Sequence, residues 1–317
     1  MSKVIVTGAA GYIGGQTVLN LLDQGHSVLA IDRQPPNSTL FNSGASWSIG
    51  DFSNEVQLES IEKFSPDAIV HCAGTSLVGP SIANPREYYH NNFVCTKKLL
   101  DFLVDKKMLN VRFVFSSSAA TYGEPIMVPC QEEDPTIPIS PYGESKLMTE
   151  FMLKSYAQAY GLNFVAFRYF NACGADSKGR HGQAPNATHI IARVLESVRD
   201  NKVFQLNGDN FPTPDKTCIR DYVHVEDIAH AHILAVDPTV PVGIYNLGTS
   251  TGASNKEVIA LAEKVTGKKV DYTVGPARAG DPAVLTASAD RYINSAKWSP
   301  QFNLEDTIRH AWTWYNK

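Results

Sequence analysis

Hydrophobic and polar positions in the first half of the chain alternate between two periods. Short apolar, β-branched runs predict strands, and longer segments with apolar positions every three or four residues predict helices. The predicted strands are Lys3–Thr7, Ser27–Ile31, Ser46–Ile49, Ala68–Cys72 and Arg112–Phe115, and the predicted helices include Tyr12–Gln24, Pro85–Lys107 and Tyr142–Tyr160. Strands this apolar have no face suited to water, so the pattern predicts a parallel sheet covered by helices on both faces.

The alternation of strand and helix signals becomes less regular after Phe167. Asn171–Pro185 and Leu206–Asp215 are rich in turn-forming residues, and shorter helices are predicted at Glu226–Val236, Asn255–Thr266 and Leu304–Tyr315. We therefore predict an α/β fold, a Rossmann-type doubly wound parallel sheet with a smaller mixed α/β substrate domain. The predicted domains are residues 1–170 and 171–317, with the chain returning to the first domain around 217–250.

A glycine-rich turn follows the first predicted strand. The sequence Gly8-Ala9-Ala10-Gly11-Tyr12-Ile13-Gly14 stands where a helix begins. Glycines here let the backbone turn sharply and approach a pyrophosphate, whose charge lies at the helix N-terminus. Asp32 ends the second strand about 20 residues on, where a carboxylate binds ribose hydroxyls and repels a 2′-phosphate. The turn predicts NAD binding by Gly8, Gly11, Tyr12, Ile13, Gly14 and Asp32.

Two neighbouring positions leave alternatives open. Arg33 follows Asp32 and favours NADP, because an arginine at this place accepts a 2′-phosphate. Asp51, followed by Phe52, comes after Gly50 at the end of the third strand. It is placed either to reach the adenine edge or to serve only as a loop carboxylate. We include Asp51 and Phe52 among the predicted cofactor residues.

A serine, a tyrosine and a lysine form the candidate catalytic set. The last predicted strand of the first half runs into Ser116-Ser117-Ser118, and Tyr142 and Lys146 lie four positions apart at the start of a predicted helix, on one face. A phenol with a pKa near 10 is a poor base unless neighbouring positive charge favours the phenolate. We predict that Tyr142 removes a proton, that Lys146 lowers its pKa and that Ser118 hydrogen-bonds the substrate oxygen.

This combination resembles the extended short-chain dehydrogenase/reductase family. Further segments are similar to the UDP-glucose 4-epimerases of that family and span almost the whole chain in the same order. They are Ala73-Gly74, Val78-Gly79-Pro80-Ser81, Tyr88-Tyr89-His90-Asn91-Asn92, Ser116–Gly123, Arg168-Tyr169-Phe170-Asn171, Arg220-Asp221-Tyr222-Val223-His224-Val225, Tyr245-Asn246-Leu247-Gly248 and Arg278-Ala279-Gly280-Asp281.

The resemblance implies a reaction and further site residues. It implies that NAD stays bound throughout the reaction. C4 of a UDP-hexose would give a hydride to NAD while Tyr142 takes the hydroxyl proton. The resulting 4-keto sugar would then rotate and be reduced on its other face. The first domain would then bind NAD and the second the nucleotide sugar. The implied cofactor residues also include Ala73, Asn91, Ser116, Tyr142, Lys146 and Tyr169, and the implied substrate residues are Ser118, Tyr142, Asn171, Asn186, Arg220, Arg278, Asp281 and Leu285.

Ala119 and Ala120 favour epimerisation over the other reactions of the scaffold. Dehydratases and decarboxylases of this group carry an acidic residue in the segment that resembles Ser118–Gly123, whereas both middle positions here are alanines. Without that group, water elimination has no acid or base. A dehydratase or a reductase that releases NADH is the alternative interpretation.

Three departures from the family pattern bear on specificity. Ser76 stands where glucose/galactose members carry a lysine, and the stretch between Asn171 and Asn186 is shorter by about five residues than in bacterial members. Leu285 occupies a position where tyrosine excludes N-acetylated sugars and a small residue admits them. We expect UDP-glucose and UDP-galactose as substrates, with UDP-GlcNAc and UDP-GalNAc left open by the intermediate size of leucine.

Composition narrows the class of partner. A net charge of −4 and a pI of about 6.1 give no reason to expect nucleic acid or a membrane surface as a partner. Five scattered cysteines predict free thiols in the cytoplasm.

His230 and His232 are two positions apart on a predicted helix and point in different directions, so we predict no metal. The resemblance implies a homodimer through the segments Pro85–Lys107 and Tyr142–Tyr160.

Overall fold

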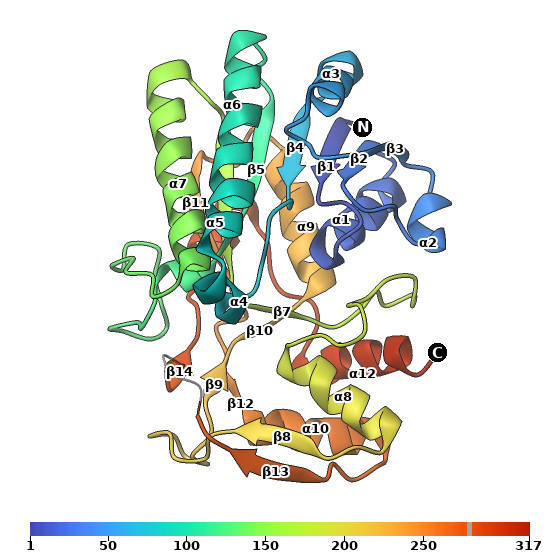
Figure 1. The fold of residues 1–317 in the computed structure, drawn as a ribbon, viewed down its shortest axis with the longest axis vertical. Helices are drawn as coiled ribbons and strands as arrows, with labels where there is room; N and C mark the ends of the chain where they lie inside the picture. The colour runs from blue at the N-terminus through green and yellow to red at the C-terminus, as the bar shows by residue number, and fades with distance from the viewer. Residues whose placement is uncertain (278–280) are drawn as a thin grey trace.

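The computed structural model describes residues 1–277 and 281–317, and within them a seven-stranded parallel sheet forms the centre of the protein (Figure 1). Its order is β11-β6-β5-β4-β1-β2-β3, and every neighbouring pair is parallel. The order reverses between β1 and β4, where open α/β sheets leave a crevice at the carboxyl ends of their strands. The strands are β1 (Lys3–Thr7), β2 (Ser27–Asp32), β3 (Ser46–Ile49), β4 (Ala68–His71), β5 (Arg112–Ser118), β6 (Phe164–Tyr169) and β11 (Gly243–Leu247).

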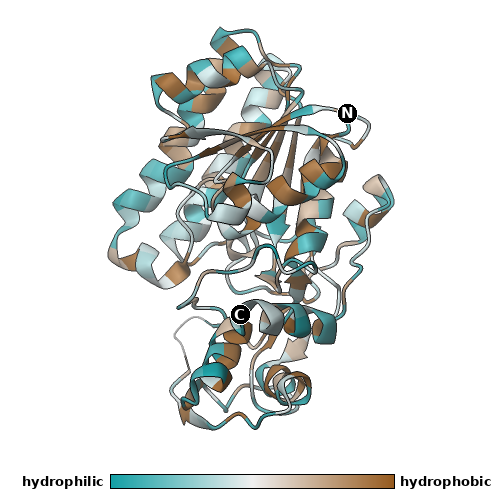
Figure 2. Cartoon of the chain, turned by 90° about the vertical axis from the view of Figure 1, so that its right-hand side faces the viewer, coloured by the Kyte–Doolittle hydropathy of each residue, from teal (hydrophilic) through white to brown (hydrophobic). Residues whose placement is uncertain are grey.

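Each face of the sheet is covered by helices because successive strand residues point to opposite faces. In β1, Val4 and Val6 belong to the apolar cluster shared with α1 (Tyr12–Asp23) and α9 (Val225–Val236). Ile5, between them, belongs to the cluster shared with α3 (Glu55–Phe64), α6 (Cys95–Asp105) and α7 (Pro141–Tyr160). Hydrophobic colouring runs along the strands of the sheet (Figure 2). The predicted doubly wound fold is confirmed.

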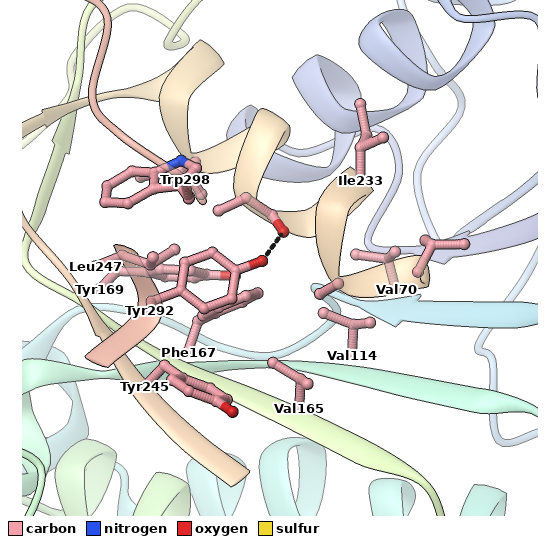
Figure 3. Close-up of a cluster of buried hydrophobic side chains, with 14 of the residues drawn as sticks. Val70, Val114, Val165, Phe167, Tyr169, Ile233, Tyr245, Leu247, Tyr292 and Trp298 are labelled. Atoms are coloured by element: carbon pink, nitrogen blue, oxygen red, sulfur yellow. Dashed lines mark hydrogen bonds between the residues drawn. The ribbon is translucent and has the colours of Figure 1, made fainter. Parts of the chain in front are cut away.

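Segments from the second half of the chain also pack on this sheet. Strand β11 pairs with β6, and Tyr292 of α11 (Asp290–Ala296) lies edge-on to Phe167, with 4.7 Å between ring centroids (Figure 3). The Tyr292 hydroxyl donates to the Ala231 carbonyl at 2.7 Å, and the Trp298 indole donates to Asp227 O at 3.0 Å. The division into domains at residue 170 stays a prediction.

The smaller lobe has its own core. It contains the helices α8 (Ile190–Asp200), α10 (Asn255–Thr266) and α12 (Leu304–Tyr315). Strand β10 (Tyr222–His224) pairs with β7 (Asn171–Cys173), and β13 (Tyr272–Gly275) pairs with β8 (Phe204–Asn207). Strand β9 (Ile219–Arg220) lies between β12 (Ala253–Ser254) and β14 (Val284–Leu285) and pairs with both. Apolar side chains of the three helices pack against β7, β8 and β10. This lobe carries the mixed α/β character that the sequence predicts.

The predicted helix Pro85–Lys107 is interrupted. The chain forms α4 (Val78–Ala83) and α5 (Pro85–Tyr88), then the π-helix η1 (Tyr89–Val94), and only then α6. A π-turn holds one more residue than an α-turn and often marks a functional site. Here Asn91 and Asn92 both donate to Thr75, to its hydroxyl at 2.7 Å and its carbonyl at 3.0 Å. Two short helices, α2 (Ser38–Phe41) and η2 (Ala119–Thr121), complete the elements.

Candidate active site

The glycine turn packs too tightly for side chains. Gly8 has φ +68°, and a Cβ there would lie 2.7 Å from Ala73 N; a Cβ on Gly14 would lie 2.1 Å from the Gly8 carbonyl oxygen. Gly11 is the N-cap of α1, and no described side chain caps it, nor does its first turn carry an acidic residue. The backbone N–H groups at this helix N-terminus therefore suit an anion such as a pyrophosphate.

Asp32 lies beside this turn and helps to hold it. Its carboxylate accepts from Ala10 N at 2.9 Å and from Gln34 N at 2.8 Å. A carboxylate offers about four acceptor sites, so capacity remains for ribose hydroxyls. Arg33, the residue that favours NADP in the sequence, is exposed.

Asp51 and Phe52 are placed differently from each other. The Asp51 carboxylate accepts from Ser53 N at 2.9 Å and from the Ser53 hydroxyl at 2.8 Å, so it also organises its own loop. The Phe52 ring is buried in the core, edge-on to His71 with 4.8 Å between ring centroids. Phe52 therefore packs in the core, and only its backbone is left as a cofactor contact.

Helix α7 brings Tyr142 and Lys146 to the end of β5. Ser140 caps the helix by accepting from Gly143 N at 3.2 Å, and Tyr142 lies in the first turn. Lys146 Nζ donates to the Ser116 carbonyl at 2.8 Å and lies 6.0 Å from the centroid of the Tyr142 ring. The Ser118 hydroxyl accepts from Ala120 N at 3.1 Å. The sequence-predicted trio thus meets at one edge of the sheet.

Burial dominates the ionisation of this pair. It lowers the pKa of Lys146 from 10.5 to about 8. Burial raises the pKa of Tyr142 above its ordinary value, while a hydrogen bond with Ser118 acts in the opposite direction. Desolvation of the phenolate thus opposes the lowering that is expected from Lys146 together with an oxidised nicotinamide ring, and the role of Lys146 stays a prediction.

Asn92 is a buried residue that the sequence reasoning missed. Its Oδ1 accepts from Thr75 N at 2.7 Å, and its Nδ2 donates to the Ser145 hydroxyl at 2.9 Å. It therefore joins the loop after β4 to the turn of α7 that carries Tyr142 and Lys146. Asn92 stands in the segment Tyr88–Asn92 that resembles the family, but a role was predicted only for the adjacent Asn91. Ala73 lies in the same loop, where its N–H donates to Thr7 Oγ1 at 3.3 Å.

A buried ion pair supports α7 one turn beyond Lys146. Arg168 donates to both carboxylate oxygens of Glu150, at 3.0 and 2.7 Å, and Ser117 Oγ donates to the same carboxylate at 2.6 Å. Both charged side chains are almost fully buried. Bidentate pairing of this kind fixes geometry as well as charge, and it ties α7 to the ends of β5 and β6. The sequence offered no signal for this pairing.

Among the residues predicted to bind the substrate, Arg220, Asp281 and Leu285 are brought together. Arg220 pairs with Asp281 at 3.1 Å, and Leu285 of β14 lies in register with Arg220 of β9. Asn171 pairs through its backbone with Asp221, next to Arg220. The predicted residue Arg278 lies outside the described residues.

Asn186 is hydrogen-bonded to helix α8. It is exposed, has φ +62°, and donates its backbone N–H to Glu196 at 2.8 Å. No contact in the described ranges joins it to Arg220 or Asn171.

Residues 1–277 and 281–317 contain no group of three or more histidine, cysteine or acidic side chains that could hold a metal ion. No helix in these ranges is long and apolar enough to span a bilayer.

Comparison with known proteins assigns the chain to a family. Residues 4–248 match the NAD dependent epimerase/dehydratase family. The chain belongs to that family. The family resemblance predicted from the motifs is thereby confirmed, together with the NAD dependence of the enzyme class.

Individual members of the epimerase/dehydratase family match over the full length. A UDP-glucose 4-epimerase of Halalkalibacterium halodurans is 43% identical, over 99% of this chain and 96% of that one. A crystal structure of UDP-glucose 4-epimerase from Brucella ovis in complex with NAD superposes with a TM-score of 0.94 at 37% identity, covering 100% and 99% of the two chains. The UDP-Glc/GlcNAc 4-epimerase of Campylobacter jejuni gives a TM-score of 0.85 at 35% identity, covering 99% of each.

Proposed function

We propose that this protein is an NAD-dependent UDP-hexose 4-epimerase that interconverts UDP-glucose and UDP-galactose. The single observation that carries the proposal is the meeting of Ser118, Tyr142 and Lys146 beside η2, where Ala119 and Ala120 supply no further acid or base. Full-length relatives named UDP-glucose 4-epimerase support this reading over a dehydratase or a reductase.

The residues around the crevice fit NAD. The uncapped N-terminus of α1 and the space kept by Gly8 and Gly14 suit the pyrophosphate, and Asp32 suits the adenosine ribose. The remaining proposed contacts are Gly11, Tyr12, Ile13, Asp51, Phe52, Ala73, Asn91, Ser116, Tyr142, Lys146 and Tyr169. Bound NAD supplies the hydride acceptor for oxidation of the sugar carbon and the hydride donor for its reduction.

The chain's own residues handle the proton and the sugar oxygen. Tyr142, as a phenolate, takes the proton of the 4-hydroxyl and returns it after the sugar has turned. Its place in the first turn of α7 and the buried ammonium of Lys146 favour the phenolate. Ser118, which hydrogen-bonds Tyr142, holds the substrate oxygen between the two steps. One carbon is oxidised and re-reduced, with no group placed for a second reaction.

The nucleotide end of the substrate is assigned to the smaller lobe. We assign Asn171, Asn186, Arg220, Arg278, Asp281 and Leu285 to it. Arg220 is buried and already shares its charge with Asp281, so a diphosphate bound there would compete with that carboxylate for guanidinium donors.

Leu285 decides the sugar range in this proposal. It is half-buried on β14, beside Arg220. Its side chain is smaller than tyrosine, which leaves room for an N-acetyl group at C2. The Campylobacter jejuni relative is described as acting on both the glucose and the N-acetylglucosamine forms. We extend the substrate range to UDP-GlcNAc and UDP-GalNAc on this basis.

We also propose a cytoplasmic homodimer. Exposed apolar side chains lie on the two segments expected to form the interface, with Val94 at 40%, Met148 at 38% and Phe151 at 55% exposure. The elements α7 and η1 that carry them are neighbours. The five cysteines, all free thiols, suit a reducing compartment.

The experiment that tests the function needs no added cofactor. Purified protein is incubated with UDP-galactose and, separately, with UDP-GalNAc, and the products are separated. Conversion without added NAD supports an epimerase that retains its cofactor, whereas stoichiometric NADH release points to a dehydrogenase. Tyr142→Phe should lower the rate by about 10²- to 10⁴-fold, the share that a placed acid–base group supplies, with NAD still bound.

A further inference from the structure

A chain of buried polar groups runs from the active-site edge of the sheet to helix α1. The Tyr169 hydroxyl lies 2.8 Å from Ser116 Oγ and makes a short hydrogen bond with His232 Nε2. His232 Nδ1 lies 3.4 Å from Thr17 Oγ1. All four side chains are buried, so each polar atom must find its partner within this chain.

The imidazole in the middle is neutral. His232 is fully buried, and its recorded polar partners are hydroxyl groups, which offer no negative charge to stabilise an imidazolium. Burial lowers the pKa of His232 to about 3. A neutral imidazole carries one N–H and one acceptor nitrogen, so the two ring nitrogens must play opposite roles.

Thr17 decides which nitrogen carries the proton. Its hydroxyl donates to the Ile13 carbonyl at 2.9 Å, the common bond from a helical threonine to the residue four positions earlier. That proton is then not available to His232, so Thr17 Oγ1 acts as the acceptor and His232 Nδ1 as the donor. Nε2 is left as an acceptor, and Tyr169 must donate to it. A tyrosine has one hydroxyl proton. Tyr169 is also placed to donate to Ser116 Oγ, but once its proton lies in the bond to His232 the Ser116 hydroxyl must be the donor of that pair.

We propose that His232 is a positioning residue: protonated on Nδ1, it accepts from Tyr169 and so orients the hydroxyls of Tyr169 and Ser116 at the cofactor site. The Tyr169 oxygen then keeps one lone pair, and no proton, for a ligand. The imidazole ring is held edge-on by Phe167 and Tyr169, each with 5.6 Å between centroids. Ser116 also binds Lys146 Nζ through its carbonyl, so the same residue links this chain to the catalytic lysine.

The inference rests on the proposed function only where it assigns Tyr169 and Ser116 to the cofactor. Its first test does not involve catalysis. Protein labelled with ¹⁵N-histidine and carrying its NAD is studied by NMR at neutral pH, with the His232 signals assigned by their loss in His232→Gln. The expected spectrum shows a neutral imidazole protonated on Nδ1. An Nε2-protonated ring or an imidazolium overturns the proposal.

The second test is a double-mutant cycle read as NAD dissociation. His232→Leu should speed NAD loss about two- to tenfold, the range expected for one net hydrogen bond. His232→Gln, which keeps an acceptor, should stay close to the native rate. In a Tyr169→Phe background, His232→Leu should add nothing, because the partner hydroxyl is gone. The matched control His230→Leu, on the partly exposed side of α9, should match the native protein.

The outcomes separate the two proposals. If His232→Leu speeds NAD loss equally in both backgrounds, or in neither, His232 does not act through Tyr169 and the inference fails. If the native protein neither holds NAD nor converts UDP-galactose, the proposed function fails, and the NMR result alone then decides the hydrogen-bond order. A native enzyme that is active but shows the other tautomer overturns the inference and leaves the function intact.

Discussion

Gly143 and Ala120 lie so close together that a Cβ on Gly143 would stand 2.4 Å from the Ala120 carbonyl oxygen. This approach seats the first turn of α7 against η2, and it places Tyr142 next to Ser118. The contact involves backbone on the η2 side, which cannot move aside like a side chain.

Gly143→Ala should therefore lower both activity and stability. Relief of the overlap requires α7 and η2 to separate, at a cost of about 1–3 kcal/mol, as is typical of overpacking. Thermal unfolding and kcat with UDP-galactose measure the two effects. Gly79→Ala in α4 is the stability control, since a Cβ there would enter open space. Equal unfolding temperatures and kcat for native protein and Gly143→Ala would contradict the prediction.

Asn92→Leu should destabilise the loop after β4. The substitution leaves Thr75 N–H without its partner, and an unsatisfied buried group costs about 1–3 kcal/mol. It also removes the bond that the Ser145 hydroxyl accepts, while that hydroxyl still donates to Tyr142 O. Urea unfolding measures the loss, and turnover should fall with it because Ser145 is adjacent to the turn that carries Lys146. Asn92→Asp keeps the acceptor for Thr75 and should recover part of the stability. Equal losses in both variants would argue against the assigned roles of the amide.

Leu285→Tyr should narrow the substrate range. A larger side chain beside Arg220 fills the space assigned to the N-acetyl group, so kcat/KM for UDP-GalNAc should fall about tenfold or more relative to UDP-galactose. Leu285→Ala should shift the ratio in the opposite direction. Steady-state kinetics with both substrates measures the ratio. A ratio that is the same in both variants would place the specificity elsewhere in the lobe.

Stability should fall as the pH drops below the ordinary histidine range. Buried His71 bridges Thr7 Oγ1 at 2.7 Å and Thr96 Oγ1 at 2.9 Å, and burial lowers its pKa from 6.5 to about 3. The unfolded chain therefore binds more protons than the folded one between pH 6.5 and about 3, which favours unfolding throughout that window. The contribution is at most about 1.4 kcal/mol per pH unit.

The variant His71→Asn isolates this effect. Its free energy of unfolding, measured with urea at pH 7, 6 and 5, should decline less steeply than that of the native protein, even if it is lower at pH 7. His90→Asn, at an exposed position, is the control. Parallel pH curves for His71→Asn and the native protein would show that His71 does not contribute to the acid sensitivity.

Much of the first half was predictable because its signals are local. The strand ranges Lys3–Thr7 and Ser46–Ile49 were predicted to the residue, and the first is a continuous apolar, β-branched run that is buried from Val4 onward. The break of the predicted helix Pro85–Lys107 into α5, η1 and α6 was not predicted. That break depends on Thr75, which is distant in the sequence and binds both Asn91 and Asn92.

The sequence by itself determined the features that can be recognised from residue type and spacing. These are the glycine turn, Asp32, the pair Tyr142 and Lys146, and the two alanines after Ser118. Only the tertiary structure decided which distant groups support them. The Glu150–Arg168 pair, the Asn92 bridge and the His232–Tyr169 bond join residues 18, 53 and 63 positions apart. Such contacts leave no periodic trace in a sequence, because buried polar groups are paired by whichever elements packing brings together. The same packing raises the pKa of Tyr142 by desolvation, an effect that spacing alone does not express because burial is a property of the folded protein.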